Sequence, residues 1–137
     1  NYEIERCYYQ NIKNGKDIVL EDGRIIENDQ LTFDPVPAKN YAFCSDTVYN
    51  EAILPIIENI DVLYHESTFL QSEENLAKKT LHSTAKEAAT IALKANAKQL
   101  ILGHYSTRYE SIELFKEEAE TIFPEVLLAD DGKSFEF

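Results

Sequence analysis

Polar side chains that could do chemistry follow three short apolar runs of the sequence. Asp46 stands just after the first run, the pair His65 and Glu66 ends the second, and His104 follows the third. The remaining histidine, His82, lies directly before a helix-start signal. Because an open α/β sheet forms its sites beyond the carboxyl ends of its strands, we expect these groups at one edge of one sheet.

This set of side chains suits metal-assisted hydrolysis of a phosphoester. A carboxylate such as that of Asp46 can give one oxygen to each of two divalent ions, and the neutral imidazole of His104 is a common zinc ligand. Two such ions stabilise both the attacking and the leaving oxygen of an in-line displacement. A further histidine beside a carboxylate could donate a proton to the leaving group. Two ligands are too few even for one tetrahedral zinc, so we expect the site to be incomplete in this chain.

Each residue also has an ordinary structural explanation. Asp46 before a threonine is typical of a helix N-cap, and a single histidine such as His82 is commonly a hydrogen-bonded boundary residue. Glu66 could be a solvated loop carboxylate, and Arg108 and Tyr109 an exposed pair at the start of a helix. These explanations do not account for the gathering of all these groups at one expected edge.

The elements that must position these residues alternate along the chain. Strands are expected at 41–44, 62–64, 99–102 and 126–129, and helices near 48–58, 84–96 and 111–122. The second helix opens with Thr84 followed three residues later by Glu87, which predicts a capping box. Strands that alternate with helices predict βαβ units with parallel strands and helix-covered faces.

The first 40 residues have a different pattern. Two β-like runs flank Asp22 and Gly23, a strong signal for a hairpin with a two-residue turn. At the other end, residues 133–137 alternate well enough to predict a last short strand. We therefore predict one α/β domain over 1–137, with strands and a hairpin in 1–40 and the βα units that carry the site in 41–137.

Composition narrows the class of protein. Hydrophobic residues make up 44% and charged residues 28%, which is ordinary for a soluble domain, and no apolar run approaches the ~18 residues of a membrane span. Cys7 and Cys44 lack metal-type or redox-type spacing, so we expect a cytoplasmic protein that does not bind membranes. A start at Asn1 and the absence of methionine predict a truncated or processed part of a longer protein.

Four segments, in order, resemble ribonuclease Z of the metallo-β-lactamase superfamily. Ser45-Asp46-Thr47 is similar to the (Gly/Ser)-Asp-Thr motif of nucleases with this fold. The other three segments, 65–69, 82–89 and 102–109, resemble the family's His-Glu-(Ala/Ser)-Thr-Phe, His-Ser-Thr-Ala-x-Glu-Ala-Ala and Leu-Thr-His-x-Ser-x-Arg-Tyr. The resemblance covers nearly the whole chain and implies the C-terminal half of a metallo-β-lactamase αββα sandwich.

The resemblance also implies an activity and a set of roles. The parent protein would be a zinc-dependent endoribonuclease that removes the 3′ trailer from precursor tRNA, with two Zn²⁺ per complete site and a homodimeric state. Asp46 matches the ligand that bridges the two zincs and His104 a terminal zinc ligand. His82 matches the catalytic histidine near the scissile phosphate, and Glu66 the carboxylate that orients it. Contacts to the substrate phosphate are expected from Ser106 and Arg108.

The sequence departs from the family in three respects. The His-x-His-x-Asp-His signature, the remaining zinc histidine and the basic tRNA-binding arm do not occur here, so we expect little or no zinc in this chain alone and no activity. A net charge of −12 should repel RNA at long range, an objection that the family's basic arm reduces. Gly103 replaces the usual threonine, which should cost little because its side chain is not a ligand. His65 is expected to be structural.

Three other interpretations remain open at this point. A metallo-β-lactamase-fold hydrolase of another phosphodiester or ester would use the same groups, although the segments 82–85 and 104–109 favour ribonuclease Z. A response-regulator-like module would use Asp46 as a phosphoacceptor, but the acidic pair Asp130 and Asp131 lies at the wrong end for it. The third is a non-catalytic α/β module with capped helices.

Overall fold

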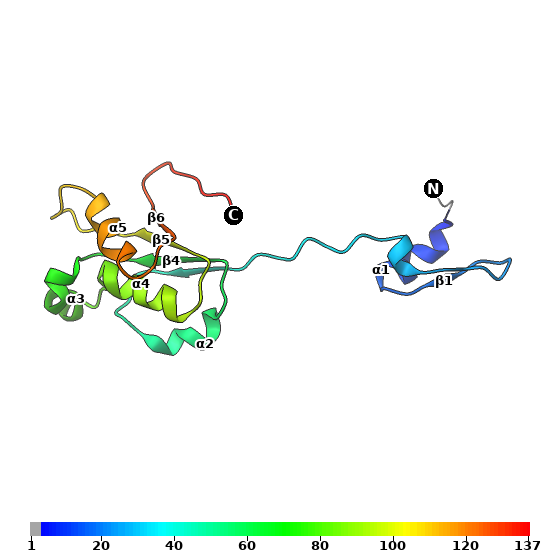
Figure 1. The fold of residues 1–137 in the computed structure, drawn as a ribbon, viewed down its shortest axis with the longest axis horizontal. Coiled ribbons are helices and arrows are strands. Elements are labelled where there is room, and N and C mark those ends of the chain that lie inside the picture. Colours follow the sequence, from blue (N-terminus) through cyan, green and yellow to red (C-terminus); the bar gives the residue numbers. More distant parts are fainter. Residues whose placement is uncertain (1–3) are drawn as a thin grey trace. The chain divides into compact units, whose positions relative to one another are not determined.

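The computed structural model describes residues 4–137, which fall into two compact units. The division lies between Ala38 and Lys39 (Figure 1). Within the described range, no helix combines the length and the apolar character that crossing a membrane would take.

The smaller unit combines a short helix with a hairpin. Its elements are the 3-10 helix η1 (Arg6–Tyr8), helix α1 (Tyr9–Lys13), strands β1 (Ile18–Val19) and β2 (Ile25–Ile26), and the 3-10 helix η2 (Asn28–Gln30). Ile18 and Ile26 pair across the antiparallel hairpin and are both buried. The Asn28 side-chain amide donates to the Ile12 carbonyl, which joins the helix to the hairpin.

The predicted hairpin is confirmed, but the two-residue turn is wrong. Leu20 N donates to Arg24 O, so three residues form the loop, and Gly23 supplies the left-handed backbone with φ +82°. Helix α1 was not predicted, because the first 40 residues were expected to form strands and turns. The one local signal for it is Gly15 with φ +72°, since a left-handed glycine commonly ends a helix.

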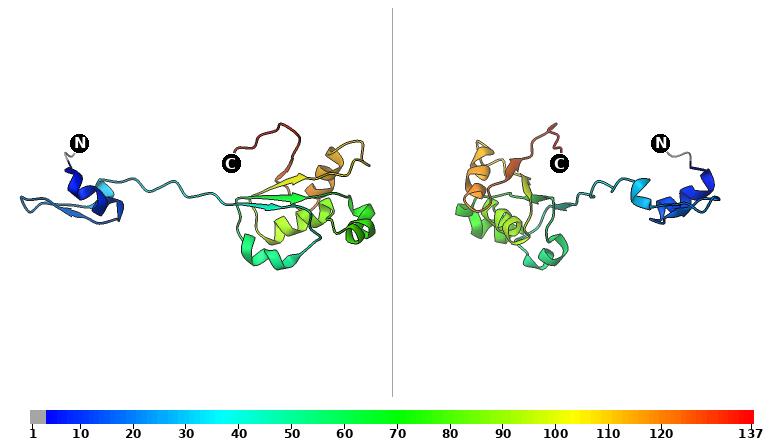
Figure 2. Two further views of the ribbon diagram at one scale, coloured as in Figure 1. Left: turned by 180° about the vertical axis from the view of Figure 1, so that it is seen from behind. Right: turned by 45° about the vertical axis from the view of Figure 1, so that its right-hand side comes forward.

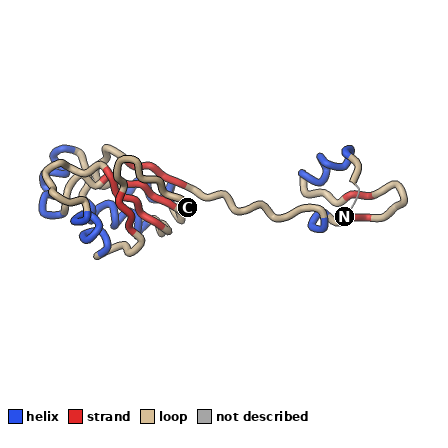
Figure 3. The backbone as a smooth tube through the Cα atoms, turned by 90° about the horizontal axis from the view of Figure 1, so that it is seen from above, coloured by secondary structure: helices blue, strands red, loops and turns tan. Residues whose placement is uncertain are grey.

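The larger unit is built on a parallel sheet of four strands in sequence order, which lie side by side in Figure 3. The strands are β3 (Tyr41–Cys44), β4 (Val62–Glu66), β5 (Gln99–Gly103) and β6 (Val126–Leu128). The segments between them hold η3 (Glu51–Ile53), α2 (Leu54–Ile57), η4 (Gln71–Glu73), α3 (Glu74–Thr80), α4 (Ala85–Lys94) and α5 (Glu113–Glu120), shown from two further sides in Figure 2. The predicted parallel βα units are confirmed.

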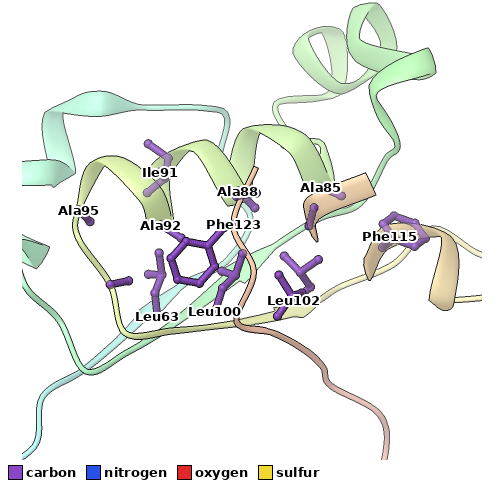
Figure 4. Packing of buried hydrophobic residues seen from close by; sticks show 14 of the residues in the cluster. Leu63, Ala85, Ala88, Ile91, Ala92, Ala95, Leu100, Leu102, Phe115 and Phe123 are labelled. Carbon is purple, nitrogen blue, oxygen red and sulfur yellow. The ribbon is translucent and has the colours of Figure 1, made fainter. Parts of the chain in front are cut away.

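The helices cover one face of this sheet. Each connection moves the chain one strand further in the same direction, and right-handed crossovers then place every helix on the same side. Ala88 and Ala92 of α4 pack with Leu63 and Leu100 of the sheet, and Phe115 of α5 completes this layer (Figure 4). A doubly wound module such as a response regulator carries helices on both faces. One-sided cover is instead the arrangement of half an αββα sandwich.

Helix α4 begins where the sequence predicts. The Thr84 hydroxyl accepts from Glu87 N at 3.1 Å, and the Glu87 carboxylate accepts from Thr84 N at 2.9 Å, so the capping box is confirmed. Small alanine side chains let the helix approach the sheet closely. The cap follows His82 by two residues, so it also fixes the position of that histidine.

Three elements differ from the sequence prediction. The helix expected near 48–58 is reduced to η3 and α2, and α3 was not predicted. No strand forms over 133–137, so that prediction is wrong. Phe137 instead stacks on Tyr41 of β3, with 6.0 Å between the ring centroids. Because β3 and β6 are opposite edges of the sheet, the last residues cross its helix-free face rather than pair with an edge.

Candidate functional site

Four residues singled out from the sequence meet at the carboxyl edge of the larger sheet. Asp46, Glu66 and His104 lie at the ends of β3, β4 and β5, and His82 precedes α4. His104 Nε2 is 3.3 Å from Asp46 Oδ1, and the ring centroids of His82 and His104 are 5.2 Å apart. One donor atom each of Asp46, His82 and His104 lies within 4.8 Å of the other two, a spacing that could hold a metal ion.

The backbone at this edge is unusual. Asp46 and His104 have left-handed backbones, with φ of 50° and 61°, and Leu81 before His82 has φ of 63°. Such conformations cost a residue of order 1–3 kcal/mol, although Asp and His tolerate them better than most. They persist only where the surrounding structure fixes them. Two side chains of the cluster are therefore carried by left-handed residues, and His82 directly follows one.

Glu66 is the buried centre of the hydrogen-bond network. Its Oε1 accepts from His82 Nδ1 and Thr47 N, both at 2.8 Å, and its Oε2 accepts from the Thr68 hydroxyl at 2.7 Å and from the backbone of Thr68 and Ser83 at 3.2 Å. Burial raises the pKa of the Glu66 carboxyl, but these donors together bring it below its ordinary value. Glu66 is thus an ionised acceptor, not a solvated loop carboxylate.

The Glu66 carboxylate fixes one side of the His82 ring. Since an ionised carboxylate only accepts, the hydrogen of the His82–Glu66 contact belongs to His82 Nδ1. The Nε2 atom of His82 is then the nitrogen that can bind a metal or exchange a proton. The side chain remains partly exposed, at 23%, so a ligand can reach it.

Ser106 and Arg108 lie beside this cluster. Ser106 N donates to Thr68 O at 3.1 Å, which anchors the segment after β5 to the segment after β4. The Arg108 guanidinium lies over the Phe69 ring, 5.8 Å from Cζ to the centroid, and that ring is 6.3 Å from the His82 ring. An exposed cation is therefore placed near His82. An open cleft of about 560 Å³ also begins at His104 and continues past Tyr105 and Ser106.

Gly103 leaves room for the Tyr64 ring. A Cβ atom at this position would lie 2.8 Å from two ring carbons of Tyr64, closer than real Cβ atoms approach. Tyr64 itself stacks on Phe43, with 4.4 Å between the ring centroids. A side chain at position 103 would therefore require Tyr64 to move, directly beside His104.

The His65 side chain points away from the cluster of Asp46, His82 and His104 and into the core. It is 1% exposed, and its Nδ1 donates to the Glu66 carbonyl oxygen at 2.8 Å. Its Nε2 has no hydrogen-bond partner among residues 4–137. Burial lowers the pKa of His65. This is the environment of a neutral structural histidine.

We expect the free energy of unfolding to fall as the pH is lowered from about 7 to about 5. Because the pKa of His65 is lowered in the folded state, the unfolded chain binds more protons below the ordinary histidine pKa of about 6.5. The stability is complete above that pH and is lost below it, by at most about 1.4 kcal/mol per pH unit from one histidine.

Urea unfolding between about pH 5 and 8 measures this slope, and His65→Leu should reduce it. Ile91→Val, a mild change at another buried position, should lower stability equally at each pH and keep the slope. The same slope in His65→Leu as in the unchanged chain would assign the effect to another group.

Thr68 is the site residue that sequence reasoning missed. Its hydroxyl lies 2.7 Å from Glu66 Oε2 and 2.8 Å from His104 Nδ1, so it connects the two. The only sequence signal was its place in the segment 65–69, because no local spacing rule joins residues that are 36 positions apart.

Comparisons with known sequences and solved structures identify relatives of this chain. No protein-family model matches the chain. A ribonuclease Z of Parabacteroides distasonis is 47% identical over 131 residues, which cover 96% of this chain and 43% of that protein. A ribonuclease Z of Bacteroides thetaiotaomicron is 48% identical, with 96% and 40% covered. The solved metallo-β-lactamase fold protein YhfI of Bacillus subtilis matches with a TM-score of 0.64 at 29% identity, over 69% of this chain and 38% of that one.

These matches define both the family and its extent here. The chain spans about two-fifths of the length of the curated relatives, and nearly all of the chain takes part in each match. The structural match to YhfI agrees with a partial metallo-β-lactamase fold. The chain belongs to the ribonuclease Z family of the metallo-β-lactamase superfamily.

Proposed function

We propose that this chain supplies the proton-transfer pair and part of the metal site of a zinc-dependent endoribonuclease that removes the 3′ trailer from precursor tRNA. The observation that carries the proposal is the meeting of Asp46, His104 and the His82–Glu66 pair at one sheet edge. Membership of the ribonuclease Z family supports the choice of substrate.

The donor set fits zinc. Asp46 offers carboxylate oxygens and His104 an imidazole nitrogen, the ligand types that zinc takes in hydrolytic sites. When bound, such an ion polarises a phosphoryl oxygen and lowers the pKa of water. Two zinc ions need more ligands than Asp46 and His104 can supply. The others would come from the part of the family's length that this chain does not span.

The chain's own residues would act on the substrate directly. Glu66 holds the His82 ring through Nδ1, so His82 Nε2 can carry a proton and donate it to the leaving alkoxide oxygen. Arg108, whose guanidinium lies over the Phe69 ring, would contact a phosphate, together with the neighbouring Ser106. The cleft of about 560 Å³ at His104 leaves room for the adjoining nucleotide. The net charge of −12 means that long-range attraction of tRNA would have to come from outside this chain.

The proposal predicts a sharp difference between this chain alone and the same chain in a complete enzyme. A hybrid enzyme can be made by placing the 137 residues into the Parabacteroides distasonis ribonuclease Z in exchange for the segment they match. The chain alone should hold well below one zinc after dialysis and should not cleave precursor tRNA, because its ligand set is open. The hybrid enzyme should bind zinc and release the 3′ trailer.

Zinc analysis and trailer cleavage on both proteins decide the matter. A chelator-resistant, stoichiometric zinc in the chain alone would contradict the incomplete site. A folded, zinc-loaded hybrid enzyme that leaves precursor tRNA intact would contradict the proposed function. Chelation of the active hybrid should abolish cleavage, and added zinc should restore it.

A further inference from the structure

We infer that Thr68 is a positioning residue that links Glu66 to His104, so that one buried carboxylate sets the tautomer of both histidines of the site. The inference rests on the proposed function only where His104 is taken as a metal ligand. The hydrogen-bond assignment itself depends on the described contacts alone.

The assignment follows from counting hydrogens. The ionised Glu66 carboxylate only accepts, so the single hydroxyl hydrogen of Thr68 points to Glu66 Oε2 at 2.7 Å. The Thr68 oxygen can then only accept in its 2.8 Å contact with His104 Nδ1. His104 Nδ1 therefore carries a hydrogen. The same carboxylate takes the Nδ1 hydrogen of His82 through its other oxygen.

In its neutral form, each ring is thereby left with an unprotonated Nε2. For His104 this nitrogen lies 3.3 Å from Asp46 Oδ1, so a lone pair faces a carboxylate oxygen with no hydrogen between them. Two acceptors at this distance repel each other unless a cation lies between or beside them. Thr68 thus prepares His104 to bind a metal through Nε2.

Thr68 is itself held rigidly. It is 8% exposed, its backbone N–H donates to Glu66 Oε2 at 3.2 Å, and its carbonyl accepts from Ser106 N at 3.1 Å. The next residue, Phe69, forms a bridge with Thr84 at the start of α4. The hydroxyl position is therefore fixed by contacts on both sides of the residue.

The spectroscopic test uses the 137-residue chain without metal. Long-range ¹⁵N–¹H spectra of the histidine rings, recorded at a pH of about 8.5 where ordinary imidazoles are neutral, distinguish the two tautomers. Both His82 and His104 should show a hydrogen on Nδ1 in the unchanged chain. An Nε2–H tautomer of His104 in that chain would overturn the inference without any variant.

Two substitutions separate the hydroxyl from the shape of the side chain. Thr68→Val keeps the shape and removes the hydroxyl, so His104 should lose its pure Nδ1–H tautomer while His82 keeps its own. Thr68→Ser restores the hydroxyl and should restore the His104 signal, which a purely structural role of Thr68 would not predict. An Nδ1–H tautomer of His104 that survives in folded Thr68→Val would overturn the inference.

The consequence for metal binding is measured in the hybrid enzyme. Loss of a hydrogen-bond partner behind a metal-binding histidine typically weakens metal affinity by about 10–100-fold. Thr68→Val should weaken zinc binding by this amount, and Thr68→Ser should stay close to the unchanged hybrid. Equal zinc affinity of the two variants would contradict the positioning role. An inactive hybrid with the expected tautomers would instead count against the proposed function alone.

Discussion

Asp46→Ala in the hybrid enzyme should lose both zinc and cleavage, whereas His82→Ala should lose cleavage alone. Asp46 is the one carboxylate of the candidate metal cluster, and a carboxylate can be shared by two ions, so its removal would open the proposed metal site. His82 is proposed to move a proton, and loss of a positioned acid slows a reaction by ~10²–10⁴-fold. Zinc content near that of the unchanged hybrid is therefore expected for His82→Ala.

Metal analysis and single-turnover cleavage on the same preparations measure the two effects separately. Glu117→Gln, a change of an exposed glutamate on α5, serves as the matched control and should keep both zinc and cleavage. The donor atom of His82 lies within 4.8 Å of those of Asp46 and His104, so coordination by His82 is the competing assignment. A loss of zinc in His82→Ala as complete as in Asp46→Ala would establish His82 as a ligand.

The division of labour between His82 and Glu66 adds a second check. Glu66→Gln should slow cleavage less than His82→Ala does, because it acts on the reaction only through the residues it holds. The double variant should cleave only slightly more slowly than His82→Ala, by much less than the factor that Glu66→Gln causes on its own. The reason is that both changes disable one functional unit. Strict additivity would show that Glu66 and His82 act independently.

The sequence predicted the strands of the larger sheet because each contains a short apolar run, although Tyr41 and Phe43 of β3 are exposed. Residues 100–102 are apolar and buried throughout, and such a continuous run is typical of a strand in a parallel sheet. Their predicted parallel order placed Asp46, Glu66 and His104 at one edge, where the structure has them. The capping box at Thr84 was also local, since both of its hydrogen bonds join residues three positions apart.

The remaining features depend on contacts that no local pattern contains. Apolar and polar residues alternate over 133–137 as in a strand, but Phe137 stacks on Tyr41, near the start of the larger unit. The need for glycine at position 103 comes from Tyr64 on the neighbouring strand. The Thr68 bridge likewise joins two strand ends. Each of these features requires the folded sheet before it can be recognised.

Glu66→Gln should destabilise the 137-residue chain by about 3–5 kcal/mol, because it breaks a buried charged network at its centre. The carboxylate accepts from the loops after β3 and β4 and from Ser83 before α4, so it joins three segments of the edge. A glutamine keeps one acceptor oxygen and turns an N–H₂ group toward donors that then lack a partner. Hydrogen bonds to charged groups are worth about 1.5–3 kcal/mol each, which makes the loss large.

Urea unfolding measures this effect, with Glu118→Gln as the matched control. Glu118 accepts from the backbone of Gln71 and Lys86, but it is only half-buried, so its change should cost about 1 kcal/mol. The pH dependence gives an independent check. The pKa of Glu66 is lowered on folding, so its contribution is complete above the ordinary glutamate pKa of about 4.3 and is lost as the pH falls through the lower folded value. The difference in the free energy of unfolding between Glu66→Gln and the unchanged chain should therefore become smaller in acid. A difference below about 1 kcal/mol at neutral pH would contradict a stabilising role for this network.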